Sequence, residues 1–171
     1  MEQHIDQVRK VFKKSGFNDK DIYRLASVLS RLETEVGPSK CWNVGDVQVL
    51  DKAFTTSHAY HPCYKGKNVN PLVLAIYNIF PDEENGEIML IRKSICKNYH
   101  CMNPRHLFYG DHIDLKIEKW KRKGVNIDKN KYTKVLWMYK NNSKSMSYRK
   151  IANEFDLNYN VVRSICNYER N

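Results

Sequence analysis

Two cysteines and a histidine lie close together in the segment Cys96-KNYH-Cys101-MNPR-His106, with four residues between successive members. Thiolate sulfur and imidazole nitrogen together select zinc, which they bind in a tetrahedron. Asn103-Pro104 favours a loop over a continuous helix in this segment. The spacing therefore predicts a structural zinc ion held by Cys96, Cys101 and His106.

A tetrahedral zinc site needs a fourth ligand from elsewhere in the chain. Cys41 and Cys63 are the cysteine candidates, and the histidine candidates are His58, His61 and His100. The chain has five cysteines, and this odd number favours metal binding over a complete disulfide framework.

Residues 41–120 resemble the HNH, or ββα-metal, endonucleases, especially the zinc-bearing branch related to the His-Cys box homing endonucleases. The matching pieces are Cys41-Trp42, the run C-x4-C-MNP-x-H-L from Cys96 to Leu107, the run Phe108-Tyr109-Gly110, and Asp114. In that branch a cysteine of a Cys-Trp pair completes the zinc site, so the resemblance implies Cys41 as the fourth ligand, ahead of Cys63. It also implies a source in a phage or mobile element.

A nuclease of this family needs a general base and a ligand for a divalent ion at the scissile phosphate. The base, a histidine two residues before the first loop cysteine, maps by spacing to Ser94. The metal ligand, an asparagine or histidine on the next helix, maps to Leu115. Serine takes up no proton near neutral pH and leucine binds no cation, so the scaffold is catalytically degenerate. His112 and Asp114 are the candidate substitutes.

Positive charge is concentrated in the last third of the chain. Residues 1–114 carry 15 Lys plus Arg against 14 Asp plus Glu, and residues 115–171 carry 14 against 5, for net charges of +1 and +9. Such asymmetry is typical of nucleic-acid binding, and the alternative is a solubilising tail. One basic run that we expect to follow the DNA backbone comprises Lys116, Lys119, Lys121, Arg122 and Lys123.

Residues 131–169 predict three helices. The first covers Lys131 to Lys140, Ser147 caps the second, and Asn158 caps the third after a turn at Asp156-Leu157. This pattern resembles a helix-turn-helix, as in recombinases, sigma-like factors and the C-termini of some phage HNH proteins, although glycine is usual where Asp156 stands. The alternative is a three-helix packing unit without a ligand.

In a helix-turn-helix the first residues of the third helix meet base edges in the major groove. Here those residues are Asn158, Tyr159, Asn160 and Arg163. Asparagine pairs with adenine and arginine with guanine. Arg149 and Lys150, at the second helix, suit phosphate contacts.

The remaining segments give weaker patterns. Residues 1–36 predict a helical hairpin, with helices over 5–15 and from Asn18 or Asp19 to about Glu33, as a candidate contact for a protein partner. Short strands are expected from Cys41 to about Tyr64 and over 88–91, and helices over 72–80 and 111–123. An acidic turn is expected over 81–86.

We therefore predict an α+β protein. A helical arm at 1–36 is followed by a zinc-stapled ββα-metal domain at 37–123. A linker at 124–130 then leads to the helix-turn-helix at 131–171. No apolar run is long enough to cross a bilayer, and MEQHIDQVRK lacks the apolar stretch of a secretion signal, so a cytoplasmic location is expected.

The predicted function is sequence-specific binding of double-stranded DNA, with transcription regulation as its output. The alternatives are an active homing endonuclease with relocated catalytic residues, which would need Mg2+, and an interaction module that docks through residues 1–36.

Overall fold

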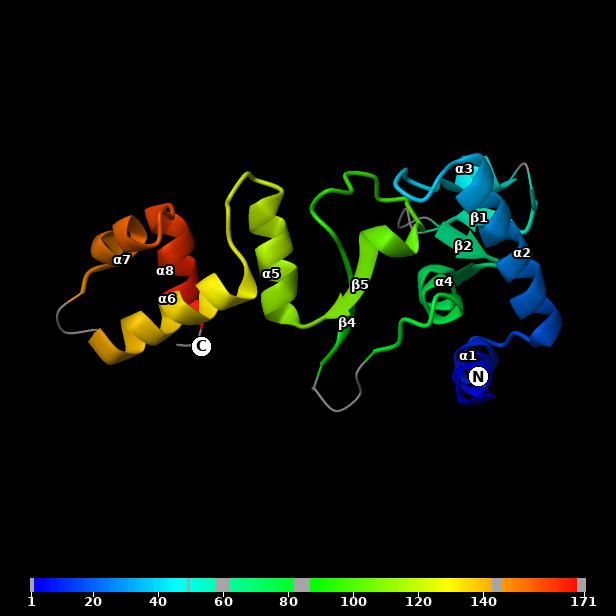
Figure 1. Ribbon diagram of the computed structural model, residues 1–171, viewed down its shortest axis with the longest axis horizontal. Coiled ribbons are helices and arrows are strands. Elements are labelled where there is room, and N and C mark those ends of the chain that lie inside the picture. The colour runs from blue at the N-terminus through cyan, green and yellow to red at the C-terminus, as the bar shows by residue number, and fades with distance from the viewer. Residues whose placement is uncertain (1, 49, 58–61, 82–86, 143–145, 169–171) are drawn as a thin grey trace. The chain divides into compact units, whose positions relative to one another are not determined.

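The computed structural model describes residues 2–48, 50–57, 62–81, 87–142 and 146–168. They form an α+β protein that divides into two compact units, unit 1 at Met1–His112 and unit 2 at Ile113–Asn171 (Figure 1). Each unit has its own hydrophobic core.

Unit 1 combines helices with two small antiparallel sheets. In chain order its elements are α1 (Glu2–Lys14), α2 (Asp19–Glu35), α3 (Val44–Gln48), β1 (Phe54–Thr56), β2 (Pro62–Tyr64), β3 (Lys67–Asn68), α4 (Asn70–Ile76), β4 (Met89–Arg92), the short 3-10 helix η2 (Pro104–His106) and β5 (Leu107–Gly110). Strands β1, β2 and β3 form one sheet in that order, and β4 pairs with β5, with Ile91 opposite Phe108.

The two expected N-terminal helices are confirmed. Gly16 ends α1 in the left-handed region at φ +81°, and the Phe17 amide donates to the Phe12 carbonyl at 2.9 Å. Asn18 caps α2 through a capping box with Asp21. Because Gly16 terminates α1 and Asn18 is already the N-cap of α2, the turn between the two helices is short.

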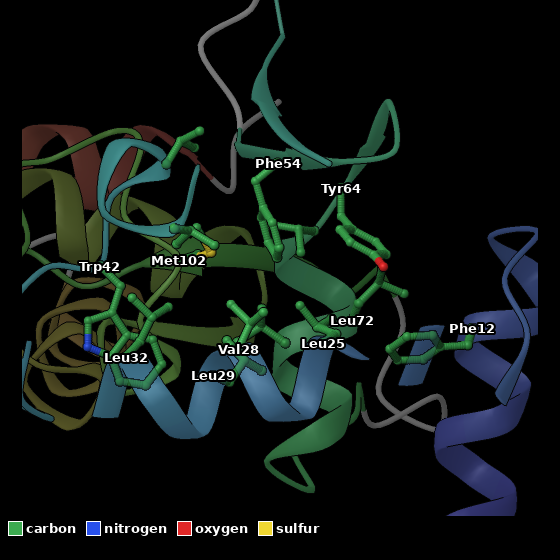
Figure 2. Packing of buried hydrophobic residues seen from close by; sticks show 14 of the residues in the cluster. Phe12, Leu25, Val28, Leu29, Leu32, Trp42, Phe54, Tyr64, Leu72 and Met102 are labelled. Carbon is green, nitrogen blue, oxygen red and sulfur yellow. The ribbon is translucent and has the colours of Figure 1, made fainter. Parts of the chain in front are cut away.

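The buried face of α2 organises the core of unit 1. Leu25, Leu29 and Leu32 lie on this face, and Figure 2 shows them among the residues drawn from the other elements. The other large core side chains, all fully buried, are Phe12, Trp42, Phe54, Tyr64, Leu72 and Met102. Because Met102 belongs to the loop between β4 and β5, the core holds that loop in place.

Two expected elements in unit 1 differ from the structure. Val44–Gln48 forms the helix α3 and not a strand, because Val44 and Val47, three residues apart, both point into the core. The Asn43 amide also donates to the Asp46 carboxylate at 3.0 Å, as at a helix start. The expected helix over 72–80 begins earlier and ends at Ile76, and Asn78 follows at φ +60°. Most of the expected acidic turn, at 82–86, lies outside the described residues.

Unit 2 is helical. It contains nearly all of α5 (His112–Lys121), then α6 (Lys129–Asn142), α7 (Tyr148–Glu154) and α8 (Tyr159–Tyr168). Ile117 and Trp120 of α5 pack in its core, and the Trp120 ring stacks on Tyr132 of α6 with centroids 6.3 Å apart. The division between the units thus falls at the start of α5, after His112, whereas the predicted domain boundary was the linker at 124–130.

A tight turn joins α7 to α8. Asp156 takes up the left-handed conformation, φ +47°, and the Leu157 amide donates to the Ala152 carbonyl at 2.9 Å. This geometry usually requires glycine, but a short polar side chain such as aspartate tolerates it. Asp156 therefore fills the position where glycine was expected without changing the turn.

Among the described residues, the structure contains no helix that combines the length and the apolar character needed to cross a membrane.

Candidate metal centre

Four side chains of unit 1 converge on one point, namely those of Cys41, Cys96, Cys101 and His106. Their three sulfur atoms and one imidazole nitrogen all lie within 4.8 Å of one another. The Cys41 and Cys96 sulfur atoms are 3.6 Å apart, and His106 Nδ1 lies 3.7 Å from the Cys41 sulfur and 3.4 Å from the Cys101 sulfur.

These separations match a tetrahedral metal ion. Metal–sulfur bonds of about 2.3 Å and a metal–nitrogen bond of about 2.0 Å place ligand atoms about 3.8 Å apart for two sulfurs and about 3.5 Å apart for sulfur and nitrogen. The four residues therefore form a group that can bind a metal ion, and its donor set is compatible with structural zinc.

Trp42 anchors Cys41 to the loop that carries the other ligands. Its side chain is buried in the core, and the indole Nε1 donates to the Gly37 carbonyl at 2.9 Å. Its own carbonyl accepts the Met102 amide at 3.0 Å. The Cys-Trp pair thus joins a ligand to a packing residue that fixes the ligand's position.

Asn103 also connects the ligand loop to the segment before Cys41. Its fully buried amide nitrogen donates to the carbonyls of Pro38 and Lys40, at 2.9 and 2.6 Å. Its side-chain oxygen accepts the Arg105 amide at 2.9 Å, which caps η2, and Pro104 begins that helix. The Asn-Pro pair therefore places His106 and holds the segment before Cys41 beside it.

The loop between Cys96 and Cys101 is held by groups that the sequence did not reveal. Arg92, on β4, donates to the carbonyls of Cys101 and Tyr99 at 2.7 and 2.8 Å, and its guanidinium lies 3.9 Å from the Cys96 sulfur. Asn98 contacts the side chain of Asn43 and accepts the His100 amide at 2.8 Å. No motif marks Arg92 or Asn98, since the groups that they contact come together only in the folded loop.

The thiol groups differ in acidity. Burial raises the pKa of the Cys41 thiol, and it raises the pKa of the Cys101 thiol to about 12. Burial also opposes ionisation of Cys96, but hydrogen bonds with the Asn98 backbone and the Arg92 guanidinium outweigh it and lower the pKa of that thiol. Cys96 is therefore the thiol best prepared to ionise before a metal ion arrives.

His106 is suited to bind as a neutral ligand. Burial lowers the pKa of its imidazole, against a hydrogen bond with the Ser39 backbone that raises it. The imidazole is therefore neutral near pH 7, so one of its ring nitrogens can bind a metal ion without net loss of a proton. The Ser39 contact also helps to orient the ring toward the thiols, as hydrogen-bonded partners of metal-binding histidines commonly do.

The other candidates for the fourth ligand are not in this group. Cys63 is buried in the central strand, β2, of the three-stranded sheet. His100 lies on the ligand loop without contributing to the cluster, and His58 and His61 lie outside the described residues.

The positions expected to carry catalysis in a nuclease are divided between the units. Ser94 follows β4 in unit 1, and Leu115 lies on α5 in unit 2. Of the candidate substitutes, His112 forms an exposed pair with Glu87, 3.3 Å from ring to carboxylate. Asp114 accepts a hydrogen bond from Lys129 at 3.1 Å.

Most of the predicted DNA-contacting side chains are exposed. On and after α5 these are Lys119, Lys121, Arg122 and Lys123, and on or beside α7 and α8 they are Arg149, Lys150, Asn158, Tyr159, Asn160 and Arg163. Lys116 is half-buried, and burial lowers the pKa of its amine. Lys121 donates to Glu118 at 3.1 Å, so part of its charge is offset within α5.

No known protein family, curated protein or solved structure matches this chain.

Substitution of single cysteines should separate ligands from core residues. Cys101→Ser should release the metal ion and destabilise unit 1, because binding of a structural metal contributes directly to folding. Cys63→Ala, which removes a buried thiol outside the cluster, should keep one metal ion per chain. Metal content and thermal unfolding with and without a chelator measure both effects. Metal loss from Cys63→Ala together with retention in Cys41→Ser would contradict the ligand set.

Metal binding should release protons. At about pH 7 we expect at least two protons per ion, because the thiols of Cys41 and Cys101 have raised pKa values and must ionise to bind. Cys96, whose thiol has a lowered pKa, adds a proton only to the extent that it is still protonated. His106, with its lowered pKa, should contribute none. Metal affinity should accordingly increase as pH rises through neutrality. Calorimetric titration in buffers of different ionisation enthalpy counts the protons, and release of clearly fewer than two would contradict these thiol states.

Proposed function

We propose that this chain is a sequence-specific, regulatory protein that binds double-stranded DNA, with one structural zinc ion holding unit 1 and α8 reading the DNA. The observation that carries the proposal is the two-sided character of α8. Its buried face comprises Val161, Val162 and Ile165, and its exposed face begins with Asn160 and Arg163. A helix that is packed on one side and presents amide and guanidinium groups on the other has the chemistry needed in the major groove.

Zinc is the ion that best fits the centre of unit 1. Three sulfur donors and one imidazole favour zinc over magnesium or calcium, which prefer oxygen ligands. Four protein ligands fill a tetrahedral shell and leave no position for a reactive water molecule. The proposed role of zinc is therefore to stabilise the fold.

The junction between α7 and α8 supports the helix-turn-helix assignment. The two helices are joined by four residues, 155–158, and pack together with α6 around Ile151, Val162 and Ile165. The left-handed Asp156 gives the sharp reversal that such a turn needs.

Side-chain contacts narrow the set of residues that can read bases. Asn158 caps α8, since its side-chain oxygen accepts the Asn160 amide at 2.8 Å, and it therefore cannot offer both amide groups to adenine. Asn160 and Arg163 are the stronger candidates. Lys150, exposed in the first turn of α7, suits a phosphate contact.

The net charge of +9 over residues 115–171 supports a nucleic-acid partner.

The regulatory output and a partner for residues 1–36 are further parts of the proposal. In that arm, His4, Ile5, Val8, Tyr23 and Ile76 of the adjoining α4 help to line a pocket of about 230 Å³.

One observation favours a second candidate function, cleavage of DNA. The elements β4, ligand loop, β5 and α5 follow one another in the order implied by the resemblance to ββα-metal nucleases. Against catalysis stand Ser94 and Leu115, which supply neither a general base nor a ligand for Mg2+.

Two basic residues should respond differently in a DNA-binding measurement. Arg163→Ala should cost about 1–3 kcal/mol and relax preference at one base pair, because a base contact is lost. Lys150→Ala should weaken binding to all sequences alike and reduce the salt dependence, because a phosphate contact is lost. Selection from a random duplex pool, followed by titrations at several salt concentrations, measures both. Lys52→Ala, which removes an exposed charge from unit 1, is the control. Equal effects of Arg163→Ala and Lys52→Ala would contradict the proposed role of α8.

The wild-type protein should not cut DNA above background with Mg2+ or Mn2+. A general base contributes about 10²- to 10⁴-fold in rate, and the metal ion adds further stabilisation of the transition state. A plasmid-nicking assay tests this expectation. Metal-dependent cutting that His112→Ala or Asp114→Ala abolishes would establish the nuclease function in place of the binding-only function.

A further inference from the structure

Three tyrosines of unit 2 meet where α7 and α8 begin. They line a pocket of about 470 Å³, here named the tyrosine pocket, whose lining residues are Tyr139, Met146, Ser147, Tyr148, Arg149 and Tyr159. Tyr148 is the first residue of α7, and Tyr159 is the first residue of α8. The pocket therefore lies beside the first residues of α7 and α8, which are the residues proposed to face DNA.

The rings form a connected row. The centroids of Tyr139 and Tyr148 are 5.4 Å apart, and those of Tyr148 and Tyr159 are 6.1 Å apart with the rings at 63°. The Tyr148 hydroxyl donates to the Asn167 side-chain oxygen at 3.2 Å, which fixes the middle ring. Tyr159, at the end of the row, is 40% exposed and offers ring surface to a ligand.

The charge at the tyrosine pocket is positive. Arg149 is exposed and is the one charged residue among the described residues that line the pocket, so no carboxylate there opposes an anion. A nucleotide combines a flat ring, which stacks on aromatic side chains, with a phosphate, which pairs with guanidinium. The lining thus matches both parts of a nucleotide.

We propose that the tyrosine pocket takes up an unpaired base of bound DNA, with the base stacked on Tyr159 and Arg149 contacting a flanking phosphate. This inference rests on the proposed function, because it assumes that the starts of α7 and α8 face DNA. A base enters a protein pocket at least cost when it is mismatched or already unpaired. The protein should therefore prefer DNA that contains an unpaired base over the same DNA fully paired.

The test uses the metal-loaded chain of 171 residues and two otherwise identical short duplexes. One carries a single bulged 2-aminopurine, and in the other the 2-aminopurine is paired with thymine. We expect about 5-fold or tighter binding of the bulged duplex, the lower end of what stacking on one aromatic ring contributes, together with a change in 2-aminopurine fluorescence on binding. Tyr159→Ala should reduce the affinity ratio to about one, and Tyr159→Phe, which keeps the ring, should restore the preference.

Trp137→Ala is the matched control, since Trp137 is the other strongly exposed aromatic residue described in unit 2, at 61%, and lies outside the tyrosine pocket. A third arm titrates free deoxyadenosine monophosphate. Binding of the free nucleotide that depends on Tyr159, without any preference for the bulge, would show a nucleotide site in place of a DNA contact and overturn the inference.

The remaining outcomes separate the two proposals. Equal binding of both duplexes by the wild type would overturn the inference and leave the proposed function intact. Binding of the bulged duplex alone, dependent on Tyr159, would support the pocket and contradict recognition of paired DNA. An absence of binding to either duplex, when both carry the sequence selected from the random pool, would overturn both.

Discussion

The convergence of Cys41 with the loop between β4 and β5 is the constraint on which unit 1 depends. Cys41 and Cys96 are 55 residues apart in the sequence, yet their sulfur atoms lie 3.6 Å apart. A metal ion bound by these residues would join the segment after α2 to the β4–β5 hairpin. Without one, the protonated thiols themselves would add only weak hydrogen bonds to this junction. The contacts of Trp42 and Asn103 then serve to bring the ligands close enough for the ion to bind.

The sequence predicted the parts of the structure that depend on local patterns. Helices α1 and α2 follow from apolar spacing and from the stop and cap at Gly16 and Asn18, all within a few residues of one another. The close spacing of Cys96, Cys101 and His106 likewise predicted three members of the cluster. Cys41 could be preferred over Cys63 only through the family resemblance, because the spacing of distant residues carries no information about which one folds back.

Features that depend on tertiary packing were not predicted. The segment at Val44 lacks a periodic pattern long enough to separate a helix turn from a strand, and only burial of Val44 and Val47 shows which forms. The apolar side of α5 could have faced either neighbour, and stacking of Trp120 on Tyr132 assigns it to unit 2. Arg92 illustrates the same limit, since its role is to donate to carbonyls that converge only in the folded loop.

The two units differ in how far apart in the chain their stabilising contacts lie, and this difference bears on folding. Unit 2 is made of helices joined by short connections, so its contacts are mostly local and are expected to form quickly. Unit 1 requires closure over the long interval between Cys41 and the ligand loop, and the proposed zinc ion would add a dependence on metal. When metal is scarce, a newly made chain is therefore expected to pass through a state in which the C-terminal helices have folded while the N-terminal unit has not. In that state the apolar residues of unit 1 would be exposed to proteases and to aggregation, so metal supply would control how much protein accumulates.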